Sequence, residues 1–335
     1  MEKTFVIAEI GINHCGKLSI AKKLISVAKK AGADAVKFQT FKTEKLIRDN
    51  EPLMSYQSNN MKKIKTNQFQ MLKKCELNHA QHKKLFLDCK KKKIEFISTP
   101  YDIDSANDLS NLGVKTIKVA STDITNEPFI KKLFKLKKKL IISTGATNLK
   151  ELSLIIKMLK IKKKNVTILH CISYYPTEVS ELNLRVIPDY FKRFKLKVGF
   201  SDHSLSLIAG AVAVSVGAKV IEKHITLDKN LEGPDHKASM EPDEFNIYVK
   251  NIRETEKILG NKKRNLSKNE SDVKKTMQKS IFLNKDKKKN DIINKHDLVI
   301  MRPATSIKPY NLEKIIGKRI KLNKKAFKVL KINEF

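Results

Sequence analysis

The stretch Lys197–His224, KVGFSDHSLSLIAGAVAVSVGAKVIEKH, decides the fold class. It opens with an apolar run of strand length, 197–200. It continues with apolar residues at helical spacing between Leu207 and Val214, and closes with a second strand-like run, 219–222. Buried parallel strands appear as short continuous apolar runs, and helices fill the crossovers between them. The stretch therefore predicts a strand, a helix and a second, parallel strand.

The same unit recurs along the first 260 residues. Eight apolar runs of strand length occur there: Phe5–Ile10, Ala35–Phe38, Glu95–Ser98, Thr116–Val119, Leu140–Ser143, Thr167–His170, Lys197–Phe200 and Lys219–Glu222. Stretches with helical periodicity separate these runs, and eight such units in about 250 residues is the size of a (β/α)8, or TIM, barrel. An open doubly wound sheet is the alternative, but it usually has a Gly-rich turn after its first strand, which this chain lacks. The sequence therefore predicts an α/β barrel.

The rest of the chain predicts a linker and a small second domain. We place the barrel at residues 1–260, the linker at 261–278, where charged residues mix with Asn and Ser, and a β-rich domain at 279–335. Its β-like pieces are Ser280–Leu283, Leu298–Met301 and Phe327–Ile332. Inside the barrel, the long polar insertion at 40–78 follows the second strand. Because loops of this length tend to be functional, we expect it to form a lid over the mouth of the barrel.

The net charge of +34 first suggests a nucleic-acid partner. Only seven of the 69 basic residues are Arg, the residue preferred for forked contacts with bases and phosphates. Lys is spread along the whole chain, with no basic stripe interleaved with aromatic residues. We therefore expect no nucleic-acid partner, and instead a positive field that attracts anionic substrates.

The composition also indicates where the chain works. No stretch approaches the roughly 20 apolar residues that a membrane span needs, so we expect no membrane partner. The four cysteines, Cys15, Cys75, Cys89 and Cys171, form no C-x-x-C pair. Scattered thiols in a chain of this size suggest a reduced, cytoplasmic location.

Polar residues stand at or just after the carboxyl end of every predicted strand. In chain order they are Glu9, Asn13 and His14; Lys37 and Gln39; Ser98 and Thr99; Lys118, Ser121 and Asp123; Ser143 and Thr144; His170 and Tyr175; Ser201, Asp202 and His203; and Glu222, Lys223 and His224. In a barrel these ends converge on one mouth, where active sites lie. The sequence therefore predicts one shared site.

The residue types in this set indicate its chemistry. Lys37 and Lys118 interrupt apolar strand sequences, and together with the nearby hydroxyls they suit an anion that bears phosphate and carboxylate groups. His203 and His224 follow adjacent strands, and two facing imidazoles are suited to a divalent metal. Glu9, on the strand next to them in a closed barrel, is positioned to bind the metal or to orient a sugar.

Other interpretations of the same residues stay open. Ser121 and Ser201 also fit the role of helix caps, and His170 that of a core histidine. Glu222 and Asp202 fit the role of structural partners for nearby cations. A Lys in an apolar pocket would also suit Schiff-base chemistry, although the histidine pair favours the metal route.

The motifs together resemble the sialic acid synthase family, which includes the N-acetylneuraminate, legionaminate and pseudaminate synthases. The matching segments are IAEIGINHCG (7–16), AGADAVKFQTFK (31–42), FISTPYD (96–102), IKVAS (117–121), IISTGA (141–146), LHCISYYPT (169–177), GFSDHS (199–204), GAKVIEKHITLDKNLEGPDHKASMEPDE (217–244) and MRP (301–303). The C-terminal piece resembles the antifreeze-like (SAF) domain of that family. KFQTFK is closer to the neuraminate and legionaminate synthases than to the pseudaminate ones.

The resemblance implies an N-acetylneuraminate synthase-type transferase. It would condense phosphoenolpyruvate with an N-acylated mannosamine-type sugar, giving a sialic-acid-type nonulosonic acid and phosphate with cleavage of the C–O bond. The implied catalytic residues are Glu9, Lys37 and Lys118, and the implied metal ligands for Mn²⁺ or Mg²⁺ are His203 and His224. The implied phosphoenolpyruvate ligands are Lys37, Thr99, Lys118, Ser121, Ser143 and Ser201. The implied sugar ligands are Glu9, Asp123, Tyr175, Asp235 and Arg302, with Arg302 acting across a domain-swapped homodimer.

Some positions depart from the family pattern. Thr122-Asp123 stand where Gly-Glu or Gly-Asp is common, and Ser173 stands where an Asn often binds the ligand. Cys15 replaces a more usual Asn or Glu, and Ala304-Thr305-Ser306 replace Gly-x-Gly.

Two rival functions remain. One is a different phosphoenolpyruvate-dependent barrel that makes a keto-deoxy sugar acid from a phosphorylated aldose, which would need a second basic cluster. The other is a non-catalytic binding protein with a basic surface.

Overall fold

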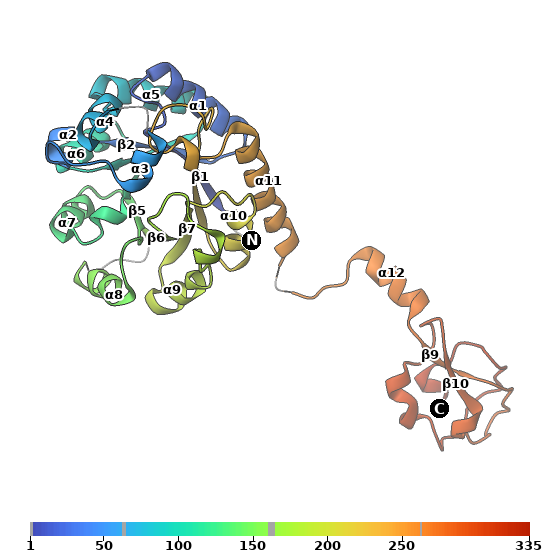
Figure 1. Ribbon diagram of the computed structural model, residues 1–335. Coiled ribbons are helices and arrows are strands. Elements are labelled where there is room, and N and C mark those ends of the chain that lie inside the picture. The colour runs from blue at the N-terminus through green and yellow to red at the C-terminus, as the bar shows by residue number, and fades with distance from the viewer. Residues whose placement is uncertain (1–2, 62–64, 160–164, 262) are drawn as a thin grey trace. The chain divides into compact units, whose positions relative to one another are not determined.

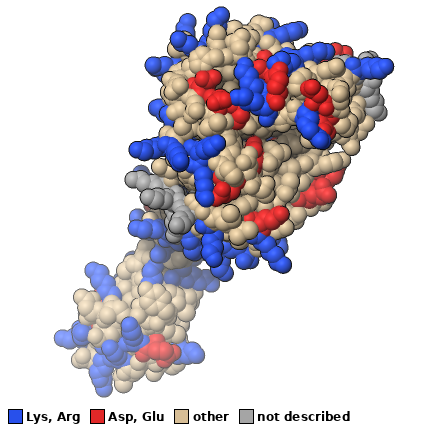
Figure 2. All heavy atoms as spheres, turned by 90° about the vertical axis from the view of Figure 1, so that its left-hand side faces the viewer, with Lys and Arg blue, Asp and Glu red and all other residues tan. Residues whose placement is uncertain are grey.

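The computed structural model describes residues 3–61, 65–159, 165–261 and 263–335. The chain forms two compact units, residues 1–260 and residues 261–335 (Figure 1). Among the described residues, no helix combines the length and the apolar character needed to cross a bilayer. On the face drawn in Figure 2, Lys and Arg side chains are scattered among acidic and uncharged ones.

The first unit is a closed barrel of eight parallel strands in the order β1 to β8, with β8 pairing back onto β1. The strands are β1 (Phe5–Gly11), β2 (Ala35–Thr40), β3 (Glu95–Pro100), β4 (Thr116–Val119), β5 (Lys139–Ser143), β6 (Val166–Cys171), β7 (Lys197–Asp202) and β8 (Val220–His224). The prediction of a (β/α)8 barrel is confirmed. Most strands run one or two residues further than predicted, because the ladder continues into polar residues that carry no apolar signal.

Helices surround this ring of strands (Figure 1). They are α1 (Leu18–Lys30), α5 (His79–Lys92), α6 (Ile103–Asn111), α7 (Glu127–Lys135), α8 (Leu149–Met158), α9 (Val186–Phe194), α10 (Ala209–Ser215) and α11 (Pro242–Leu259), with short 3-10 turns at Ser121–Asp123, Val179–Glu181 and His236–Ala238. The main core lies between strands and helices. Several helices begin with a polar cap: the side chain of Asn148, for example, accepts a hydrogen bond from the amide of Glu151.

The alternation of side chains along each strand positions the site. One buried apolar layer fills the inside of the barrel: Ile7, Ala35, Ile97, Ile141, Leu169 and Val220. Two residues further along the same strands stand Glu9, Lys37, Thr99, Ser143, Cys171 and Glu222. Since successive side chains point to opposite faces of a strand, residues two apart share a face. The polar layer therefore lies directly above the apolar one.

The insertion after β2 contains three short helices, α2 (Thr43–Leu46), α3 (Ser55–Asn60) and α4 (Gln68–Cys75). They pack on an apolar cluster of their own, formed by Ile12, Phe41, Met61, Met71, Leu72 and Cys75. Glu76 fixes the start of the insertion, because its carboxylate accepts hydrogen bonds from the backbone amide and the hydroxyl of Thr43 at 3.1 and 3.0 Å.

The second unit contains α12 (Lys268–Met277) within the segment predicted as a linker. The Ser267 side chain caps this helix by accepting a hydrogen bond from the Glu270 amide, and none of the helix residues is buried. Its apolar residues Val273 and Met277 are both exposed and too few to form a clear apolar stripe, so the cap is the main feature that distinguishes this helix from a linker.

Two of the predicted β pieces of the second unit are confirmed as strands β9 (Ser280–Leu283) and β10 (Leu298–Met301), and the structure pairs them antiparallel. Its remaining elements are the 3-10 turns Lys295–Asp297, Pro309–Lys314 and Ile332–Glu334. The predicted β piece at 327–332 is wrong. The amide of Phe327 donates to the Leu283 carbonyl and that of Leu330 to the Ser306 hydroxyl, so no ladder forms. A small core of Ile281, Leu283, Ile293, Ile307, Ile315, Ile320 and Leu330 holds the unit together.

A buried ion pair links β7 and β8 to the outer helices. Lys223 Nζ lies 3.3 Å from Asp202 Oδ2, and both side chains are fully buried. Asp202 also accepts hydrogen bonds from the Tyr248 hydroxyl, 2.9 Å away, and from the Ser204 hydroxyl, 2.7 Å away. The sequence left two interpretations of Asp202 open, a residue of the shared site or a structural partner for a nearby cation. This geometry matches the structural partner.

Removing one member of this pair should destabilise the barrel strongly. We expect Lys223→Met to lower the free energy of unfolding by about 3–5 kcal/mol, because the Asp202 carboxylate would stay buried without its cation. Lys3→Met is the matched control: Lys3 also contacts an aspartate, Asp34, but is 61% exposed, so its loss should cost about 1 kcal/mol or less. Urea unfolding followed by circular dichroism measures both. Equal effects of the two changes would contradict the expectation.

Candidate active site

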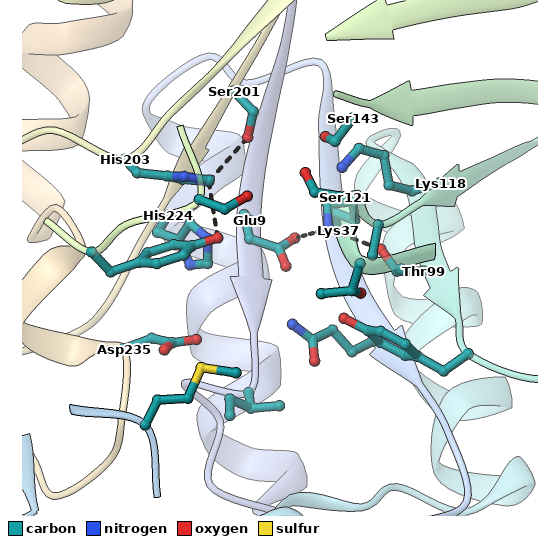
Figure 3. A pocket seen from close by; sticks show the side chains of 18 of the residues that line it. Glu9, Lys37, Thr99, Lys118, Ser121, Ser143, Ser201, His203, His224 and Asp235 are labelled. Carbon is teal, nitrogen blue, oxygen red and sulfur yellow. Dashed lines mark hydrogen bonds and ion pairs between the residues drawn. The ribbon is translucent and has the colours of Figure 1, made fainter. Parts of the chain in front are cut away.

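A cavity of about 420 Å³ opens at the carboxyl ends of the barrel strands. Figure 3 shows the labelled side chains converging on it from several barrel strands and from the loops that follow them. The cavity is lined by Glu9, Ile12, Lys37, Gln39, Leu46, Ile47, Met54, Tyr56, Gln57, Gln68, Leu72, Thr99, Tyr101, Lys118, Ala120, Ser121, Thr122, Ser143, Ser173, Tyr175, Ser201, His203, Glu222, His224 and Asp235. The shared site expected from the strand ends is therefore present as one cavity.

Two lysines and two glutamates form a buried cluster at the base of the cavity. Lys37 Nζ lies 2.9 Å from Glu9 Oε2 and 4.0 Å from Glu222 Oε2. Lys118 Nζ lies 3.3 Å from Glu222 Oε1. All four side chains are at most 5% exposed. Buried charges are tolerated only when they are paired, and here each ammonium group has a carboxylate partner.

The carboxyl groups of Glu9 and Glu222 have very different pKa values. Burial raises the pKa of Glu9 to about 7, and Glu222 adds to that rise while Lys37 opposes it. Burial alone would also raise the pKa of Glu222, but Lys118 and Lys37 outweigh it and lower the pKa to about 2. Two carboxyls held apart in this way can take different roles, one a fixed anion and one able to exchange a proton near neutral pH.

Hydroxyl groups flank the lysines. Thr99 Oγ1 accepts a hydrogen bond from Lys37 Nζ at 3.0 Å, and Ser201 Oγ donates to Glu222 Oε1 at 2.9 Å. Ser121 Oγ accepts from the Gly145 amide at 3.1 Å. Ser143 is buried in the same wall. These groups offer directional hydrogen bonds next to two positive charges, which is the chemistry that suits an anion with several oxygen atoms.

Two imidazoles face each other on the opposite wall, with ring centroids 5.6 Å apart. Burial lowers the pKa of His203 to about 4 and that of His224 well below its ordinary value, so both rings are neutral at pH 7. The Nδ1 of His203 lies 2.6 Å from the Ile172 carbonyl, which requires that Nδ1 carry the proton and leaves Nε2 as an acceptor. Nδ1 of His224 is buried with no hydrogen-bond partner among the described residues.

Aromatic and apolar side chains form the outer part of the cavity. Tyr175 stacks on His203 with centroids 4.1 Å apart, and Tyr56 from the insertion stacks on Tyr175 at 5.4 Å. Asp235 is buried beside them, and burial raises its pKa to about 6. The insertion adds the apolar residues Leu46, Ile47, Met54 and Leu72 to this wall. The segment predicted as a lid therefore lines the cavity.

Comparison with known proteins agrees with this geometry. Residues 24–264 match the NeuB family. The chain belongs to the NeuB family. It is 43% identical over 321 residues to the N,N'-diacetyllegionaminic acid synthase of Campylobacter jejuni, covering 95% of this chain and 96% of that protein. It is 41% identical to the synthase of the same name from Legionella pneumophila, covering 96% of this chain and 92% of that one.

A solved structure of the family also resembles this chain. The N-acetylneuraminic acid synthetase of Leptospira borgpetersenii, determined in complex with citrate, superimposes with a TM-score of 0.72 at 32% identity, covering 81% of this chain and 90% of that one. The resemblance to the sialic acid synthases that the motifs indicated is thereby confirmed.

Most of the predicted site residues of this NeuB-family chain line the cavity. They are Glu9, Lys37, Thr99, Lys118, Ser121, Ser143, Tyr175, Ser201, His203, His224 and Asp235. Asp123 is not among the lining residues, and its neighbour Thr122 lines the cavity instead. The Asp123 carboxylate accepts a hydrogen bond from Asn126. Arg302 is exposed in the second unit. His170 belongs to the core, with Nε2 hydrogen-bonded to the Leu182 carbonyl at 2.8 Å.

Sequence reasoning missed several residues of this NeuB-family site. Glu222 appeared among the strand-end residues but was interpreted as a structural partner, whereas it lies between both buried lysines. Tyr56 and Met54 carried no usable signal, because they sit in a polar insertion whose path across the mouth depends on tertiary packing. The side-chain hydrogen bond between Tyr56 and Asp235 also depends on tertiary packing and carried no signal in the sequence.

The buried Asp235 of this NeuB-family protein should make its stability depend on pH. In the folded chain Asp235 keeps its proton up to about pH 6, but it loses it near its ordinary pKa of 3.8 when unfolded. The folded state therefore binds more protons between these values, and stability falls as pH rises through this window. As the pH rises from about 4 to about 7, we expect the free energy of unfolding of Asp235→Asn to increase by about 2–3 kcal/mol relative to that of the wild type. Urea unfolding at both pH values tests this, and a difference that does not change with pH would contradict it.

Proposed function

We propose that this chain condenses phosphoenolpyruvate with an N-acylated mannosamine-type sugar, giving a sialic-acid-type nonulosonic acid and phosphate. The observation that carries the proposal is the pair of buried lysines, surrounded by hydroxyls, facing two neutral imidazoles across one cavity. Named synthases that share more than 40% of their residues with this chain over nearly its whole length support the same reaction.

Phosphoenolpyruvate would bind at the lysine end of the cavity. Lys37 and Lys118 supply positive charge, and Thr99, Ser121, Ser143 and Ser201 supply hydrogen bonds to the phosphate and carboxylate. In the reaction, the methylene carbon of phosphoenolpyruvate forms a bond to the sugar aldehyde carbon. Water adds to the pyruvyl C2, and phosphate leaves with the bridging oxygen. The ammonium groups stabilise the negative charge of the departing phosphate.

The facing imidazoles fit a divalent cation such as Mn²⁺ or Mg²⁺. His203 offers Nε2 because its Nδ1 is hydrogen-bonded to the Ile172 carbonyl. The buried Nδ1 of His224 has no hydrogen-bond partner in the part of the chain that the structure describes. Within the described ranges, no set of three or more His, Cys, Asp or Glu side chains is arranged to hold an ion, so water or substrate would complete the coordination. The cation, when bound, would act as a Lewis acid toward the sugar aldehyde.

Glu9 is the residue of this chain best suited to exchange a proton during the reaction. With a pKa of about 7 it is neither a fixed anion nor a fixed acid at physiological pH. Lys37 holds one carboxylate oxygen at 2.9 Å, which orients the group toward the cavity. We assign Glu9 to proton exchange at the reacting end of the sugar, beside Tyr175 and Asp235.

The sugar end favours an acylated deoxy sugar over a phosphorylated one. Leu46, Ile47, Met54 and Leu72 line it with apolar surface, which suits the methyl groups of acetamido and deoxy positions. Among the described lining residues the Lys side chains are Lys37 and Lys118, and there is no Arg. The described lining residues therefore hold no second basic cluster of the kind that a phosphorylated aldose requires. Within the class, we propose a 2,4-diacetamido-trideoxy sugar, as the names of the Campylobacter and Legionella synthases suggest.

We further propose that the second unit is an antifreeze-like (SAF) domain that brings Arg302 to the sugar in the partner subunit of a domain-swapped homodimer. Arg302 is exposed, next to Pro303, and so is accessible to such a contact. Sugar recognition by Asp123 would require its loop to move toward the cavity. The four free cysteines are consistent with work in the reducing cytoplasm.

Product analysis tests the proposed reaction. We expect phosphoenolpyruvate and 2,4-diacetamido-2,4,6-trideoxymannose to give a nine-carbon acid, detected by mass spectrometry, faster than N-acetylmannosamine does and far faster than arabinose 5-phosphate. With oxygen-18 in the bridging position of phosphoenolpyruvate, the label should appear in the released phosphate, because the C–O bond breaks. Turnover of arabinose 5-phosphate alone would favour the keto-deoxy sugar acid synthase instead. No phosphate release with any of these sugars would refute the proposal.

The proposed metal ligands can be tested without turnover. We expect His203→Ala and His224→Ala each to weaken Mn²⁺ binding, measured by calorimetry, by more than about tenfold, because each removes one of two protein ligands. His79→Ala is the matched control, since His79 lies on α5 with its ring 51% exposed, outside the cavity. Binding that survives in both cavity variants as it does in the control would place the cation elsewhere.

A further inference from the structure

The turn after β1 holds a cysteine in contact with a histidine from a distant part of the chain. Cys15 Sγ lies 3.4 Å from His236 Nε2 and 3.5 Å from the Glu232 carbonyl. His236 is fully buried, and Cys15 is the partly exposed member of the four free cysteines. Cys15 also has a φ of 48°, a left-handed conformation that disfavours most residues with a Cβ. This position is therefore strained, and the side chain makes a specific contact.

The hydrogen-bond network fixes the direction of this contact. The Thr226 hydroxyl donates its single proton to the Asp228 carbonyl at 3.0 Å. His236 Nδ1, 2.7 Å from the same hydroxyl, must therefore be the donor in that hydrogen bond. Burial keeps His236 neutral, with its pKa lowered to about 4, so Nδ1 carries the only ring proton. Nε2 is left as an acceptor for the Cys15 thiol, whose proton faces both Nε2 at 3.4 Å and the Glu232 carbonyl of the same segment at 3.5 Å.

This thiol contact is one of two ties between the same turn and the segment 232–239. The second tie runs through Asn13, whose side-chain amide donates to Ser239 Oγ at 2.8 Å, and Ser239 Oγ in turn donates to the Asp235 carbonyl at 2.6 Å. Asp235 thus directly precedes His236, which contacts Cys15, and its own carbonyl is held by Ser239, which contacts Asn13. Gly233 allows the segment to close over this contact, because a Cβ there would come within 2.8 Å of His236 Nε2.

We propose that Cys15 is a positioning residue for the amino sugar, holding Asp235 at the cavity wall through its thiol hydrogen bond to His236. The inference rests on the proposed function, because it assigns Asp235 to the sugar end. Cys15 itself does not line the cavity, so it acts only through the segment it holds. The lysine end stands on β2 and β4, away from this tie, and phosphoenolpyruvate binding should not depend on it.

Steady-state kinetics on the full chain separate this role from a general loss of structure. We expect Cys15→Ala to raise the KM for the amino sugar about five- to tenfold, the effect of losing one hydrogen bond, and to leave the KM for phosphoenolpyruvate within about twofold. Cys15→Ser retains a hydrogen-bond donor, so its KM values for both substrates should stay within about threefold of those of the wild type. Cys89→Ala, a matched removal of a thiol in the core on α5, should change neither constant.

The thiol can also be blocked chemically. Methyl methanethiosulfonate transfers its methylthio group to the Cys15 thiolate, forming a disulfide and releasing methanesulfinate. The blocked sulfur has no proton to donate, so sugar use should fall as in Cys15→Ala and return on reduction with dithiothreitol. Cys15→Ser should resist the reagent. Inactivation of Cys15→Ser to the same extent would assign the effect to another cysteine and count against the proposal.

A direct readout keeps this inference separate from the proposed function. In protein labelled with nitrogen-15 at histidine, His236 should appear as the Nδ1-protonated tautomer, and its Nε2 resonance should move when Cys15 is changed to Ala but much less when it is changed to Ser. An inactive wild type with that resonance pattern intact would refute the proposed function and leave the Cys15–His236 tie standing. An active wild type in which Cys15→Ala raises both KM values equally, or behaves like Cys15→Ser, would overturn the positioning role.

Discussion

The buried pairing of Lys37 and Lys118 with Glu9 and Glu222 is the interaction on which the rest of the site depends. A single ammonium group inside the barrel would cost several kcal/mol, and the carboxylates offset that cost. The two carboxylates are stabilised unequally, because Glu222 lies near both lysines while Glu9 contacts only Lys37. Because of this asymmetry, Glu222 stays an anion, whereas the pKa of Glu9 is about 7, close to neutral pH. When Glu9 is protonated, the two ammonium groups face a single carboxylate anion, and the net positive charge that remains favours the binding of an anion.

The strand pleat explains which sequence predictions succeeded. Lys37 and Lys118 stood out because they interrupt apolar runs, and the alternation that buries Ala35 inside the barrel turns Lys37 inward as well. The same rule sends Lys223 outward, although it lies between two cavity residues, Glu222 and His224. His170 also points outward, to the Leu182 carbonyl. A list of polar residues at strand ends contains both faces, and only the register of the pleat separates them.

The features that the sequence did not indicate depend mostly on contacts between distant segments. The insertion at 40–78 is polar in sequence, yet its apolar minority packs on Ile12 and Phe41 and carries Tyr56 over the cavity. The Cys15–His236 contact joins positions more than two hundred residues apart and leaves no periodic signal. At 327–332 Leu330 enters the small core of the second unit, whereas Phe327, Val329 and Ile332 are exposed, and no ladder forms, so an apolar run there does not indicate β structure.

These observations divide the cavity into two parts with different origins. The lysine end is built by barrel strands, whose positions are fixed by the closed hydrogen-bond network and by the apolar layer beneath. The end that we propose binds the sugar is built by the insertion at 40–78 and by the segment 232–239, which are held by side-chain hydrogen bonds and a small apolar cluster. Substitutions in those two segments can alter the preferred sugar without disturbing the buried charges. A barrel of this kind can therefore keep one reaction at its base while the choice of sugar changes above it.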